Sequence, residues 1–460
     1  MSAALTADLL RRYDRPGPRY TSYPTAVEFS PSFDAAAYEA RLAAAAKATE
    51  EPLSLYLHLP FCEERCTFCG CMVVITKKRE VAQHYLEYVH RELDLLASRL
   101  AGRRQVVQHH WGGGTPTYLS LAQIETLHAR VTRHFDVAPE AEVAIEIDPR
   151  VTSVEQLALL RRLGFNRLSM GVQDFAPDVQ RAVNRVQGEK ETRALFDAAR
   201  ELGFPSINLD LIYGLPLQTT ESFEKTLASV AAMRPDRIAV YSYAHVPWIR
   251  GHQQRLAPLE RPGPELKLEL ISRAVDRFLA AGYQAIGMDH FALPEDDLAR
   301  AQQAGTLHRN FMGYTTKRAP DMLGVGVSAI GDVRGAFVQN LKSLAAYYRA
   351  LDAGSFPVER GFATVADDRA RRHVITELMC NFRVDVRDVE RRYELDFASY
   401  FREELAELQA GPEADGLVRL APGAVEIPAR GRLLVRNVCM VFDRYLRTRA
   451  AEKPVFSRTI

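Results

Sequence analysis

Short apolar runs alternate with stretches of helical periodicity from residue 53 onward. Six of the apolar runs have the length of buried strands: 53–59, 106–111, 143–147, 167–172, 207–213 and 237–243. Amphipathic stretches with helical spacing follow them in turn: 81–100, 121–135, 154–163, 192–202, 220–233 and 264–281. Strands that alternate with helices form a parallel sheet. Six such units, where a closed barrel has eight, predict an incomplete (β/α)6 barrel of the α/β class.

The two ends of the chain depart from this alternation. Residues 11–26, RRYDRPGPRYTSYPTA, mix Pro, Gly, Arg and Tyr without a period and predict an extended arm, followed by a helix over 33–46. On composition alone, a flexible tail is the simpler interpretation of the arm. From about residue 361 the pattern predicts helices around two short strands joined through 421–423, then a last helix to residue 447, similar to a winged helix.

We therefore expect three parts: an N-terminal arm and helix at 1–50, a barrel with a covering segment at 51–360, and a mostly helical C-terminal lid domain at 361–460. The segment 307–331, LHRNFMGYTTKRAPDMLGVGVSAIG, is too rich in Gly and polar residues for a core helix. We interpret it as a cover over the barrel mouth. In barrels of this kind the chemistry lies on loops beyond the C-terminal ends of the strands.

Composition excludes several classes of function. The chain has 460 residues, 47% of them apolar, which is ample for a core. Its 59 basic and 58 acidic residues give a net charge of +1, so no global field favours nucleic acid or membranes. The winged-helix-like part is equally balanced, with 17 Lys and Arg against 16 Asp and Glu, which argues against DNA binding.

The location and the oligomeric state follow from what the pattern lacks. We find no apolar run approaching the roughly 20 residues that span a bilayer. The opening MSAALTADLLRRYD has no apolar signal core, so we expect a cytoplasmic protein. Because the chain has no heptad run, we expect a monomer.

Four of the six cysteines lie within eleven residues, FCEERCTFCGC, at 61–71. Cys62, Cys66 and Cys69 are spaced by four and three, so one short loop can present three thiolates to a small inorganic centre. A [4Fe–4S] cluster normally takes four thiolates, so three would leave one iron free. Cys71 is either the fourth ligand or a separate thiol. Structural zinc usually requires a second ligand pair, and disulfides require an oxidising compartment, so both are less favoured.

Two further motifs follow predicted strands. Glycines at 112–114, followed by Thr115, allow a backbone to approach a ligand without a Cβ in the way, although a tight turn is the simpler interpretation of glycines alone. Glu146 and Asp148 are two residues apart on the third strand and share one face. An unpaired carboxylate inside a barrel is costly, so a structural salt bridge is the alternative to ligand binding.

The spacing CxxxCxxC resembles that of the radical S-adenosylmethionine (SAM) superfamily. The flanking segments extend the likeness along nearly the whole chain: YLHLPFCEERCTFCGC, HWGGGTPTYL, EIDPR, NRLSMGVQDF, NLDLIYGLP, GMDHFA, LHRNF with GYTT, and RNVCMVFDRYL. Together they resemble the oxygen-independent coproporphyrinogen III oxidase (dehydrogenase) family. The resemblance implies that the predicted fold is a radical SAM barrel.

The resemblance also implies the cofactors and their residues. Three cysteines would hold a [4Fe–4S] cluster whose free iron chelates SAM: Cys62, Cys66 and Cys69. SAM-contacting residues would be Tyr56, Phe68, Gly113, Gly114, Thr115, Glu146 and Ile330, and a second SAM would bind Gln173, Arg185, Asp210 and Ala244. Residues implied in catalysis are Tyr56, Cys71, Glu146, Phe311 and Ile330. Without the resemblance, the aromatic residues are typical of packing, and Arg185 and Asp210 of ordinary ion pairs.

The implied activity is that of an oxidoreductase in haem synthesis. Two propionates of coproporphyrinogen III would be oxidatively decarboxylated to vinyl groups, giving protoporphyrinogen IX. A small electron donor would reduce the cluster, SAM would be cleaved to a 5′-deoxyadenosyl radical, and the radical would take a propionate β-hydrogen. Because the substrate carries four carboxylates, basic residues should surround it, with Arg19, Arg150, Arg309 and Lys317 as candidates.

The remaining observations bear on alternatives. The resemblance implies that Arg19, Tyr20 and Tyr23 of the arm cover or help to build the site. Met312 stands where relatives carry Gln, so any hydrogen bond from that amide is absent. Cys380 and Cys439 lie in apolar helical contexts, which are typical of buried thiols.

Two rival functions come from other classes. One is a haem-binding or haem-trafficking protein of the same superfamily, against which Cys71 and the Arg/Tyr arm argue. The other is a simple iron–sulfur electron carrier or zinc protein, which would need no GGGTP segment.

Overall fold

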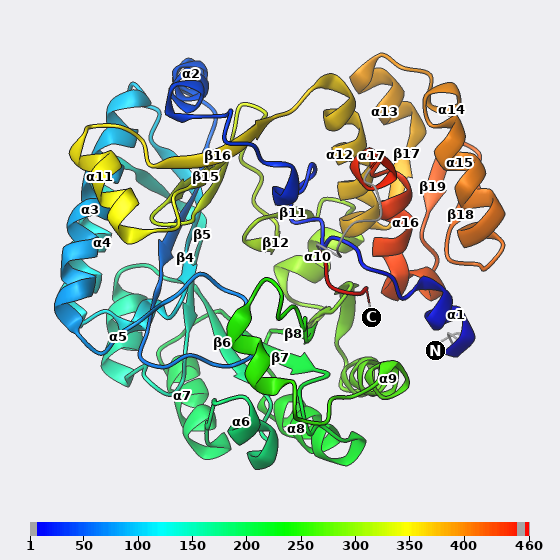
Figure 1. Cartoon of the computed structure of the whole chain (residues 1–460), viewed down its shortest axis with the longest axis horizontal. Coiled ribbons are helices and arrows are strands. Elements are labelled where there is room, and N and C mark those ends of the chain that lie inside the picture. The colour runs from blue at the N-terminus through cyan, green and yellow to red at the C-terminus, as the bar shows by residue number, and fades with distance from the viewer. Residues whose placement is uncertain (1–6, 449–455, 460) are drawn as a thin grey trace.

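The computed structural model describes residues 7–448 and 456–459 of the chain. Among these residues, twelve strands form one sheet, and seven consecutive neighbours in it run parallel (Figure 1). Six of the seven are the predicted strands: β1 (Leu53–Leu59), β4 (Gln105–Gly113), β5 (Asp136–Ile147), β6 (Arg167–Gln173), β7 (Ser206–Tyr213) and β8 (Arg237–Ser242). The sheet remains open between its two edges, so the predicted incomplete (β/α)6 barrel is confirmed.

Helices return the chain from each strand to the next. They are α3 (Arg79–Arg99), α4 (Leu121–His134), α5 (Val154–Arg162), α6 (Pro177–Ala182), α7 (Glu189–Glu201), α8 (Thr220–Met233) and α9 (Pro264–Ala280). Capping boxes begin α4, α5 and α8, because Ser120, Ser153 and Thr219 accept hydrogen bonds from N–H groups that the helix leaves without partners. The six predicted helices agree with these bounds to within three residues. Their apolar faces pack on the sheet in one main core.

Further strands extend both edges of the parallel sheet. β13 (Asp321–Val325) pairs parallel with β1, and beyond it lie β14 (Ile330–Val333), β15 (Ala336–Asn340) and β16 (Val358–Ala363). At the other edge, β10 (His290–Ala292) and β9 (Gln284–Gly287) follow β8 in antiparallel fashion. Two helices, α10 (Asp297–Gln303) and α11 (Leu344–Asp352), connect these strands to the rest. The predicted boundary at residue 360 falls inside β16, and both domain boundaries stay predictions.

The expected covering segment, 307–331, divides into two halves. Its first half forms the hairpin of β11 (His308–Asn310) and β12 (Gly313–Thr315), whereas its second half enters the main sheet as β13 and the start of β14. The interpretation as a cover is therefore wrong for residues 321–331. The glycine content misled it, because a Cβ on Gly324 would lie 2.6 Å from the backbone of Ile330. Glycine here allows two strands to approach closely.

The C-terminal part is mostly helical and lies beside the barrel (Figure 1). Its elements are α12 (Ala366–Asn381), β17 (Arg383–Asp385), α13 (Val386–Tyr393), α14 (Phe397–Tyr400), α15 (Arg402–Leu408), β18 (Arg419–Ala421), β19 (Ala424–Glu426), α16 (Val435–Val441) and α17 (Arg444–Thr448). The predicted hairpin through 421–423 is present as β18 and β19, and β17 joins it as a third strand. The predicted last helix is two helices. Cys380 and Cys439 are fully buried here, as expected.

The N-terminal arm lies between the barrel and the C-terminal part. It connects α1 (Ala7–Tyr13) to α2 (Ala35–Ala46). Tyr20 and Tyr23 are 6% and 1% exposed, and the Tyr20 hydroxyl donates to Asp443 over 2.9 Å. Arg436 donates to the carbonyl of Gly17 over 2.6 Å. The interpretation as a flexible tail is therefore wrong for residues 14–34, because buried aromatic rings and backbone hydrogen bonds anchor them.

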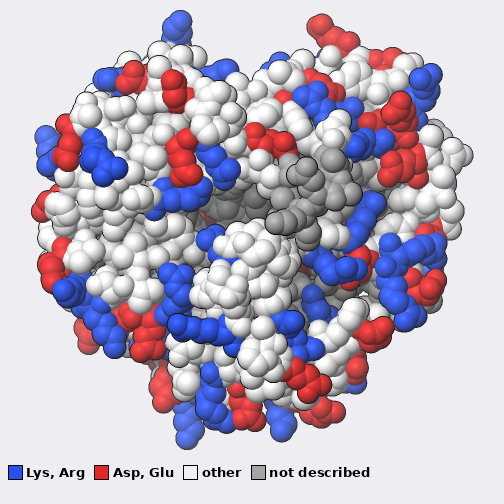
Figure 2. Space-filling view, in the orientation of Figure 1, with Lys and Arg blue, Asp and Glu red and all other residues white. Residues whose placement is uncertain are grey.

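The surface matches the balanced composition. Figure 2 shows acidic and basic side chains mixed over one face, with Lys and Arg gathered around the hollow at its centre. None of the helices in the described ranges combines the length and the apolar character that crossing a bilayer requires.

A buried ion pair joins the start of β4 to β13. Arg103 Nη1 donates to Asp321 Oδ2 over 2.5 Å, and both side chains are 0% exposed. The other guanidinium nitrogens of Arg103 donate to the carbonyls of Glu51 and Pro52. Arg103 therefore joins the start of β13 to the starts of both β1 and β4.

Asp321→Ala should lower the free energy of unfolding by about 3–5 kcal/mol, because the buried guanidinium of Arg103 loses its counter-ion. Urea unfolding followed by circular dichroism measures the change. The exposed pair of Lys342 and Glu359 provides the control, and Glu359→Ala should cost less than about 1 kcal/mol. Equal losses in the two variants would contradict the prediction.

Candidate iron–sulfur and SAM site

One cavity of about 280 Å³ lies between the cysteine loop and the carboxyl ends of the parallel strands. Twelve of the residues implied to bind the cofactors or to act in catalysis line it: Cys62, Cys66, Phe68, Cys69, Cys71, Gly113, Gly114, Thr115, Glu146, Gln173, Arg185 and Asp210. Arg150, a candidate for the substrate carboxylates, lines it as well. We call it the cysteine cavity. The parallel register brings these residues together, because strand ends from successive units meet at the same rim of the sheet.

The first side of the cysteine loop is held by the segment after α6. The backbone N–H of Thr67 donates to the carbonyl of Val183 over 3.0 Å, and Asn184 Nδ2 donates to the carbonyl of Arg65 over 3.0 Å. These bonds satisfy backbone groups that an isolated loop would leave to water. The loop therefore has a defined course before its last cysteine.

The second side is held by a 3₁₀ turn, Gly251–Leu256, that follows β8. Gln253, 1% exposed, donates through Nε2 to the carbonyls of Phe68 (2.9 Å) and Ala244 (3.2 Å). His252 Nε2 lies 2.8 Å from the carbonyl of Cys69. Sequence reasoning missed both residues, since a Gln and a His in a polar stretch carry no signal of a long-range contact.

Each of the three cysteine sulfurs lies near a hydrogen-bond donor. The contacts are Thr115 Oγ1 at 3.5 Å from Cys62 Sγ, Arg150 and Arg185 each at 3.7 Å from Cys66 Sγ, and the Cys71 N–H at 3.4 Å from Cys69 Sγ. Donors and positive charges stabilise the negative charge of a cluster. Without one, burial raises the pKa of the Cys62 thiol to about 11, whereas the hydrogen bonds from Cys71 lower that of Cys69.

This donor set fits a cluster better than it fits one ion. In the described part of the chain, no three His, Cys, Asp or Glu side chains are close enough to ligate a single metal ion. A [4Fe–4S] cluster takes one thiolate per iron, so its ligands need not converge on one point. The three cysteines face one cavity, and each sulfur has its own donor, which suits a cluster.

The glycine segment at the end of β4 packs against β5 and the start of the cysteine loop. Gly113 has φ +116°, a conformation that strongly favours glycine, and its N–H donates to Glu146 Oε2 over 3.1 Å. A Cβ on Gly114 would lie 2.6 Å from the backbone of Pro60, just before the cysteine loop. The glycines thus allow the loop and β5 to pack closely, in addition to exposing backbone groups to the cavity.

Glu146 contacts His110, which stacks on Tyr56 inside the barrel. Its Oε1 lies 3.4 Å from Nε2 of His110, and the ring of His110 stacks on Tyr56 with centroids 5.9 Å apart. Burial raises the pKa of the Glu146 carboxyl, but the hydrogen bonds from His110 and Gly113 outweigh it, so the pKa lies below its usual range. Glu146 is therefore an ionised acceptor at the cavity wall.

Asp148, which the sequence left without a role, is an ion-pairing residue. It accepts from Arg150 Nη2 over 2.7 Å and from Arg185 Nη1 over 2.9 Å. Burial raises the pKa of the Asp148 carboxyl, yet the two guanidinium groups outweigh it and lower the pKa. The structural salt bridge holds for Asp148 and Arg185. It also positions both arginines beside the sulfur of Cys66.

Asp210 lies deeper in the barrel without an ion pair among the described residues. Ser169 Oγ donates to it over 2.9 Å, and Asn208 Nδ2 donates over 2.8 Å. Burial raises the pKa of the Asp210 carboxyl to about 6. Gln173 lies at the same wall with φ +67°. Two neutral donors hold the carboxylate oriented towards the cavity.

A second cationic group borders the cysteine cavity through Tyr241, which lines it. The guanidinium of Arg19 lies 5.2 Å from the ring centroid of Tyr241 and forms an ion pair with Asp289. Arg309 is 8% exposed and stacks 4.6 Å from the ring of Tyr314. Its Nε and Nη1 have no hydrogen-bond partner among the described residues. A buried guanidinium with free N–H groups is costly unless an anion completes it.

Four of the residues implied to bind the cofactors or to act in catalysis do not line the cysteine cavity, and neither do the substrate candidates Arg19, Arg309 and Lys317. Tyr56 lies inside the barrel, with its hydroxyl 3.0 Å from His58 Nδ1. Ala244 is linked to the cavity-lining Phe68, because Gln253 donates to the carbonyls of both. Phe311 lines a separate cavity and contacts the ring of Phe337, and Ile330 begins β14. Of the arm residues, Arg19 reaches the site, whereas Tyr20 and Tyr23 pack in the C-terminal core. Sequence reasoning did not find Tyr241 or Asp289.

Two family models match the chain: the radical SAM superfamily over residues 56–230 and the HemN C-terminal domain over residues 366–434. A coproporphyrinogen III oxidase of the oxygen-independent type from Escherichia coli K12 is 48% identical over 98% of both chains. Its counterpart from Pseudomonas aeruginosa is 46% identical over 99% of this chain and 98% of its own. The chain belongs to this family. Its predicted resemblance to the family is thereby confirmed.

A solved structure agrees with the family assignment. The structure described as coproporphyrinogen III oxidase (HemN) from Escherichia coli, a radical SAM enzyme, superposes with a TM-score of 0.90 and 46% identity, covering 97% of this chain and all of that one. Membership of the radical SAM superfamily implies a [4Fe–4S] cluster and SAM, and the cysteine cavity has residues that fit both. The individual role of each residue stays a prediction.

Gln253→Leu should weaken the hold on the cysteine loop, because the carbonyls of Phe68 and Ala244 lose their donor. Losing about 1 kcal/mol of hydrogen bonding predicts roughly fivefold faster release of iron to a chelator from reconstituted protein. Gln254→Leu is the matched control, since its side chain is exposed. Identical release rates in the two variants and the parent chain would contradict this role.

Proposed function

We propose that this protein oxidatively decarboxylates two propionate groups of coproporphyrinogen III to vinyl groups, giving protoporphyrinogen IX. The observation that carries the proposal is the cysteine cavity, where the three cysteines, the glycine segment and Glu146 meet. The named activity of relatives that match this chain over 98% of their length supports the choice of substrate. Each decarboxylation releases CO₂, one hydrogen atom and one electron.

The residues that would hold the cofactors are those that line the cysteine cavity. Cys62, Cys66 and Cys69 would bind the cluster, while Gly113, Gly114, Thr115 and Glu146 would contact SAM. When bound, the cluster and SAM would supply the radical that removes a hydrogen atom from a propionate. The protein contributes position and exclusion of water. Arg150 and Arg185 keep a positive charge next to the Cys66 sulfur.

Arg309 is the best candidate in the protein for binding a carboxylate of the substrate. It is buried with two N–H groups that lack partners among the described residues. Asp289, which pairs with Arg19, also lies near enough for Arg309 to lower its pKa. A propionate carboxylate would complete that guanidinium in a paired geometry. Arg150 is a weaker candidate for this role than the sequence suggested, because Asp148 occupies it.

The catalytic roles of several residues extend this proposal. Tyr56 and Glu146 would shape the SAM and substrate face, since His110 joins them. Cys71 is exposed at the cavity wall, where a thiol can meet a substrate or a second SAM. Phe311 and Ile330 would form the wall of the substrate site on the side of β13 and β14. Nothing in the structure explains why Met312 stands where relatives carry Gln.

A second SAM molecule is part of the proposal. Gln173, Arg185 and Asp210 line the cysteine cavity. Ala244 is linked to the cavity-lining Phe68 through Gln253. An oriented carboxylate suits a ribose or an ammonium group. Arg185 pairs with Asp148 through Nη1, but its Nε has no partner among the described residues and could donate to a carboxylate. We further propose a small electron donor, a cytoplasmic location and a monomeric state, with no nucleic-acid partner.

The haem-carrier alternative has one distinguishing expectation. A carrier would bind haem and leave both SAM and coproporphyrinogen unchanged. The presence of Cys71 in the cavity and of Arg19 beside Tyr241 favours the enzyme instead.

Reconstituted protein, supplied anaerobically with reductant, SAM and coproporphyrinogen III, should form protoporphyrinogen and 5′-deoxyadenosine together. Cys66→Ala should abolish both products, because one iron loses its ligand. Liquid chromatography of both products provides the measurement, and Cys380→Ala is the control, since that thiol is buried far from the loop in the C-terminal core. SAM cleavage without change in the porphyrinogen would refute the substrate, and absence of both products would favour the carrier.

Asp210→Ala should reduce the SAM bound per cluster-loaded chain from two molecules to one, because a carboxylate that orients the second molecule is lost. Equilibrium dialysis with labelled SAM, together with iron analysis, measures the ratio. Asp297→Ala, on the surface of α10, is the control. A parent chain that binds a single SAM at saturation would overturn the two-SAM proposal.

A further inference from the structure

The segment that follows β8 lies against the cysteine loop at the protein surface. We define it as residues 245–262 and call it the Trp248 segment. Within it, His252 Nε2 lies 2.8 Å from the carbonyl of Cys69. His252 is itself partly exposed, and Cys71, two residues after Cys69, is exposed. Cys69, a predicted cluster ligand, is therefore close to the surface that this segment forms.

The cysteine loop and the Trp248 segment have an excess of positive charge. Residues 61–79 contain four Lys and Arg against two Glu, and the Trp248 segment contains three Arg against one Glu. Each segment thus contributes a charge of +2, whereas the whole chain has a net charge of only +1. The positive charge of the protein is concentrated where the predicted cluster ligands lie.

Three of these cations have no counter-charge among the described residues. No carboxylate lies within ion-pair distance of Arg65, Arg250 or Arg255, and both glutamates of the cysteine loop are paired with other cations. Burial and these three guanidinium groups lower the pKa of His252, so all three lie near it. Arg65 lines the cysteine cavity, whereas Arg250 and Arg255 do not. Arg250 and Arg255 are therefore available to a partner at the surface.

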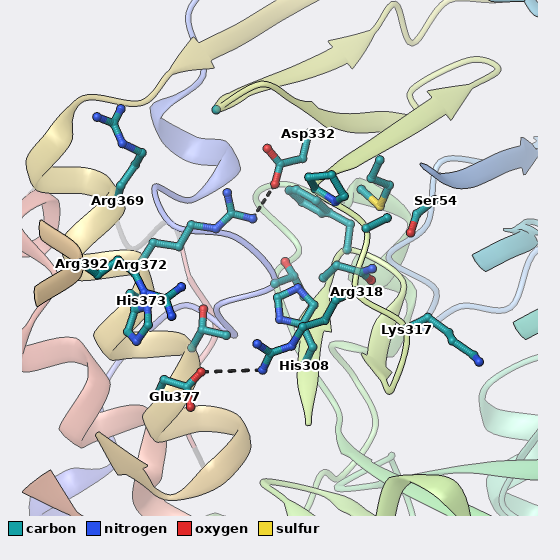
Figure 3. Close-up of a pocket in the computed structure, with 18 of the residues that line it drawn as sticks. Ser54, His308, Lys317, Arg318, Asp332, Arg369, Arg372, His373, Glu377 and Arg392 are labelled. Atoms are coloured by element: carbon teal, nitrogen blue, oxygen red, sulfur yellow. Dashed lines mark hydrogen bonds and ion pairs between the residues drawn. The ribbon is translucent and has the colours of Figure 1, made fainter. Parts of the chain in front are cut away.

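A basic cavity elsewhere in the protein compensates part of its charge internally. It has a volume of about 330 Å³ and lies between Ser54 of β1 and α12. Arg372 faces Asp332 over 2.5 Å there, and Arg318 lies 3.8 Å from Glu377 (Figure 3). No such pairing reduces the charge of the three arginines beside the cysteine loop.

Large apolar side chains are exposed around the same loop. On the Trp248 segment, Trp248 and Ile249 are 55% and 53% exposed. Val186, 66% exposed, follows the residues after α6 that bond the loop, and Ile75, 38% exposed, is the strand neighbour of Cys62. Single exposed apolar residues are ordinary, but several around one functional loop indicate a surface that another molecule covers.

This combination of side chains indicates what covers the surface. Tryptophan and arginine are among the residue types that contribute most at protein interfaces. Unmatched arginines around an apolar centre complement a protein surface with carboxylates around an apolar centre of its own. The proposed reaction also begins with an electron that the protein receives from another molecule, and the predicted cluster ligands lie beside this surface.

We propose that Trp248, Arg250 and Arg255 form the docking surface for a small acidic electron-carrier protein that holds a flavin. This inference rests on the proposed function, which requires an external electron donor. In the transfer, the reduced flavin loses one electron and the cluster gains it, and no covalent bond forms or breaks. The apolar dimethylbenzene edge of a flavin suits Trp248 and Ile249, while carboxylates around that edge suit the arginines. Docking there places the flavin beside the segment that contacts the carbonyl of Cys69.

A purified acidic flavodoxin is the probe for this surface. Its binding to cluster-loaded protein is followed by the anisotropy of a fluorescent label on the flavodoxin. Arg250→Gln with Arg255→Gln should raise the Kd about fourfold and flatten its dependence on salt, because each exposed charge contributes a factor of about two. Trp248→Ala should raise the Kd about tenfold, since a central aromatic residue contributes more than the charges around it.

A second readout separates docking from a merely structural role. Reduction of the cluster by reduced flavodoxin, followed by electron paramagnetic resonance, should slow in step with binding in both variants. Reduction by dithionite needs no docking, so SAM cleavage driven by dithionite should stay within about twofold of the parent chain. Loss of the reaction with dithionite as well would assign Trp248, Arg250 and Arg255 to the structure of the loop and overturn the docking surface.

The matched control removes two arginines from the opposite end of the barrel. Arg133 and Arg162 are exposed in the last turns of α4 and α5. Helices between parallel strands run back along the sheet, so these turns lie away from the carboxyl ends of the strands. Arg133→Gln with Arg162→Gln changes the net charge equally and should leave the Kd for flavodoxin within about twofold.

The other outcomes overturn the inference or separate it from the proposed function. Equal Kd values in the two test variants and the control would refute the surface. A parent chain that accepts electrons from an acidic ferredoxin but not from flavodoxin would refute the flavin carrier. If flavodoxin binds through Trp248 and the arginines while coproporphyrinogen III stays unchanged with dithionite, the proposed function fails and the docking surface stands.

Discussion

The parallel pairing of β1 with β4 is the constraint on which the rest of the site depends. The register places Leu59 opposite Gly113, at the point where both strands end. Beyond it the chains stay bonded, since Gly114 donates to the carbonyl of Leu59 over 2.9 Å and Thr115 to that of Phe61 over 2.8 Å. The cysteine loop therefore begins against the glycine segment. A shift of one residue would move Thr115 away from the sulfur of Cys62.

Much of the fold could be predicted because the relevant signals are local. Apolar runs and helical spacing depend on neighbours within a few residues, so α8 was predicted with the bounds it has, Thr220–Met233. The cysteine spacing and the glycine segment are equally local. β13 could not be predicted, because DMLGV becomes a strand only by pairing with β1, more than 250 positions earlier.

The site was predictable where a motif specifies chemistry, and it was not where a tertiary contact does. Glu146 and Asp148 were expected to share a face, yet only the fold shows that one meets His110 and the other two arginines. Gln253 holds two backbone segments from a position that no pattern distinguishes. The same holds for Arg309, whose free N–H groups become evident only once its burial is known.

Electrostatic balance separates the two ends of the barrel interior. Near the cysteines, each strongly buried charge has a counter-charge or several donors, as Asp148 and Glu146 show. In the cavity between Ser54 of β1 and α12, basic side chains outnumber carboxylates by five to two. A gradient of this kind would orient a polyanion before any specific contact forms, because clefts lined by one sign of charge focus the field.

The backbone bonds between the arm and the other end of the chain set an order of assembly during synthesis. Gly17 donates to the carbonyl of Ser457, and Thr459 donates to that of Arg15, a separation of 444 positions. The arm emerges from the ribosome first, but these partners emerge after the cysteine loop and all the barrel strands. Asp289 and Tyr241, which hold Arg19, are made well before these partners. The arm can therefore dock at Arg19 first, and the bonds of Arg15 and Gly17 to the other end of the chain close it last.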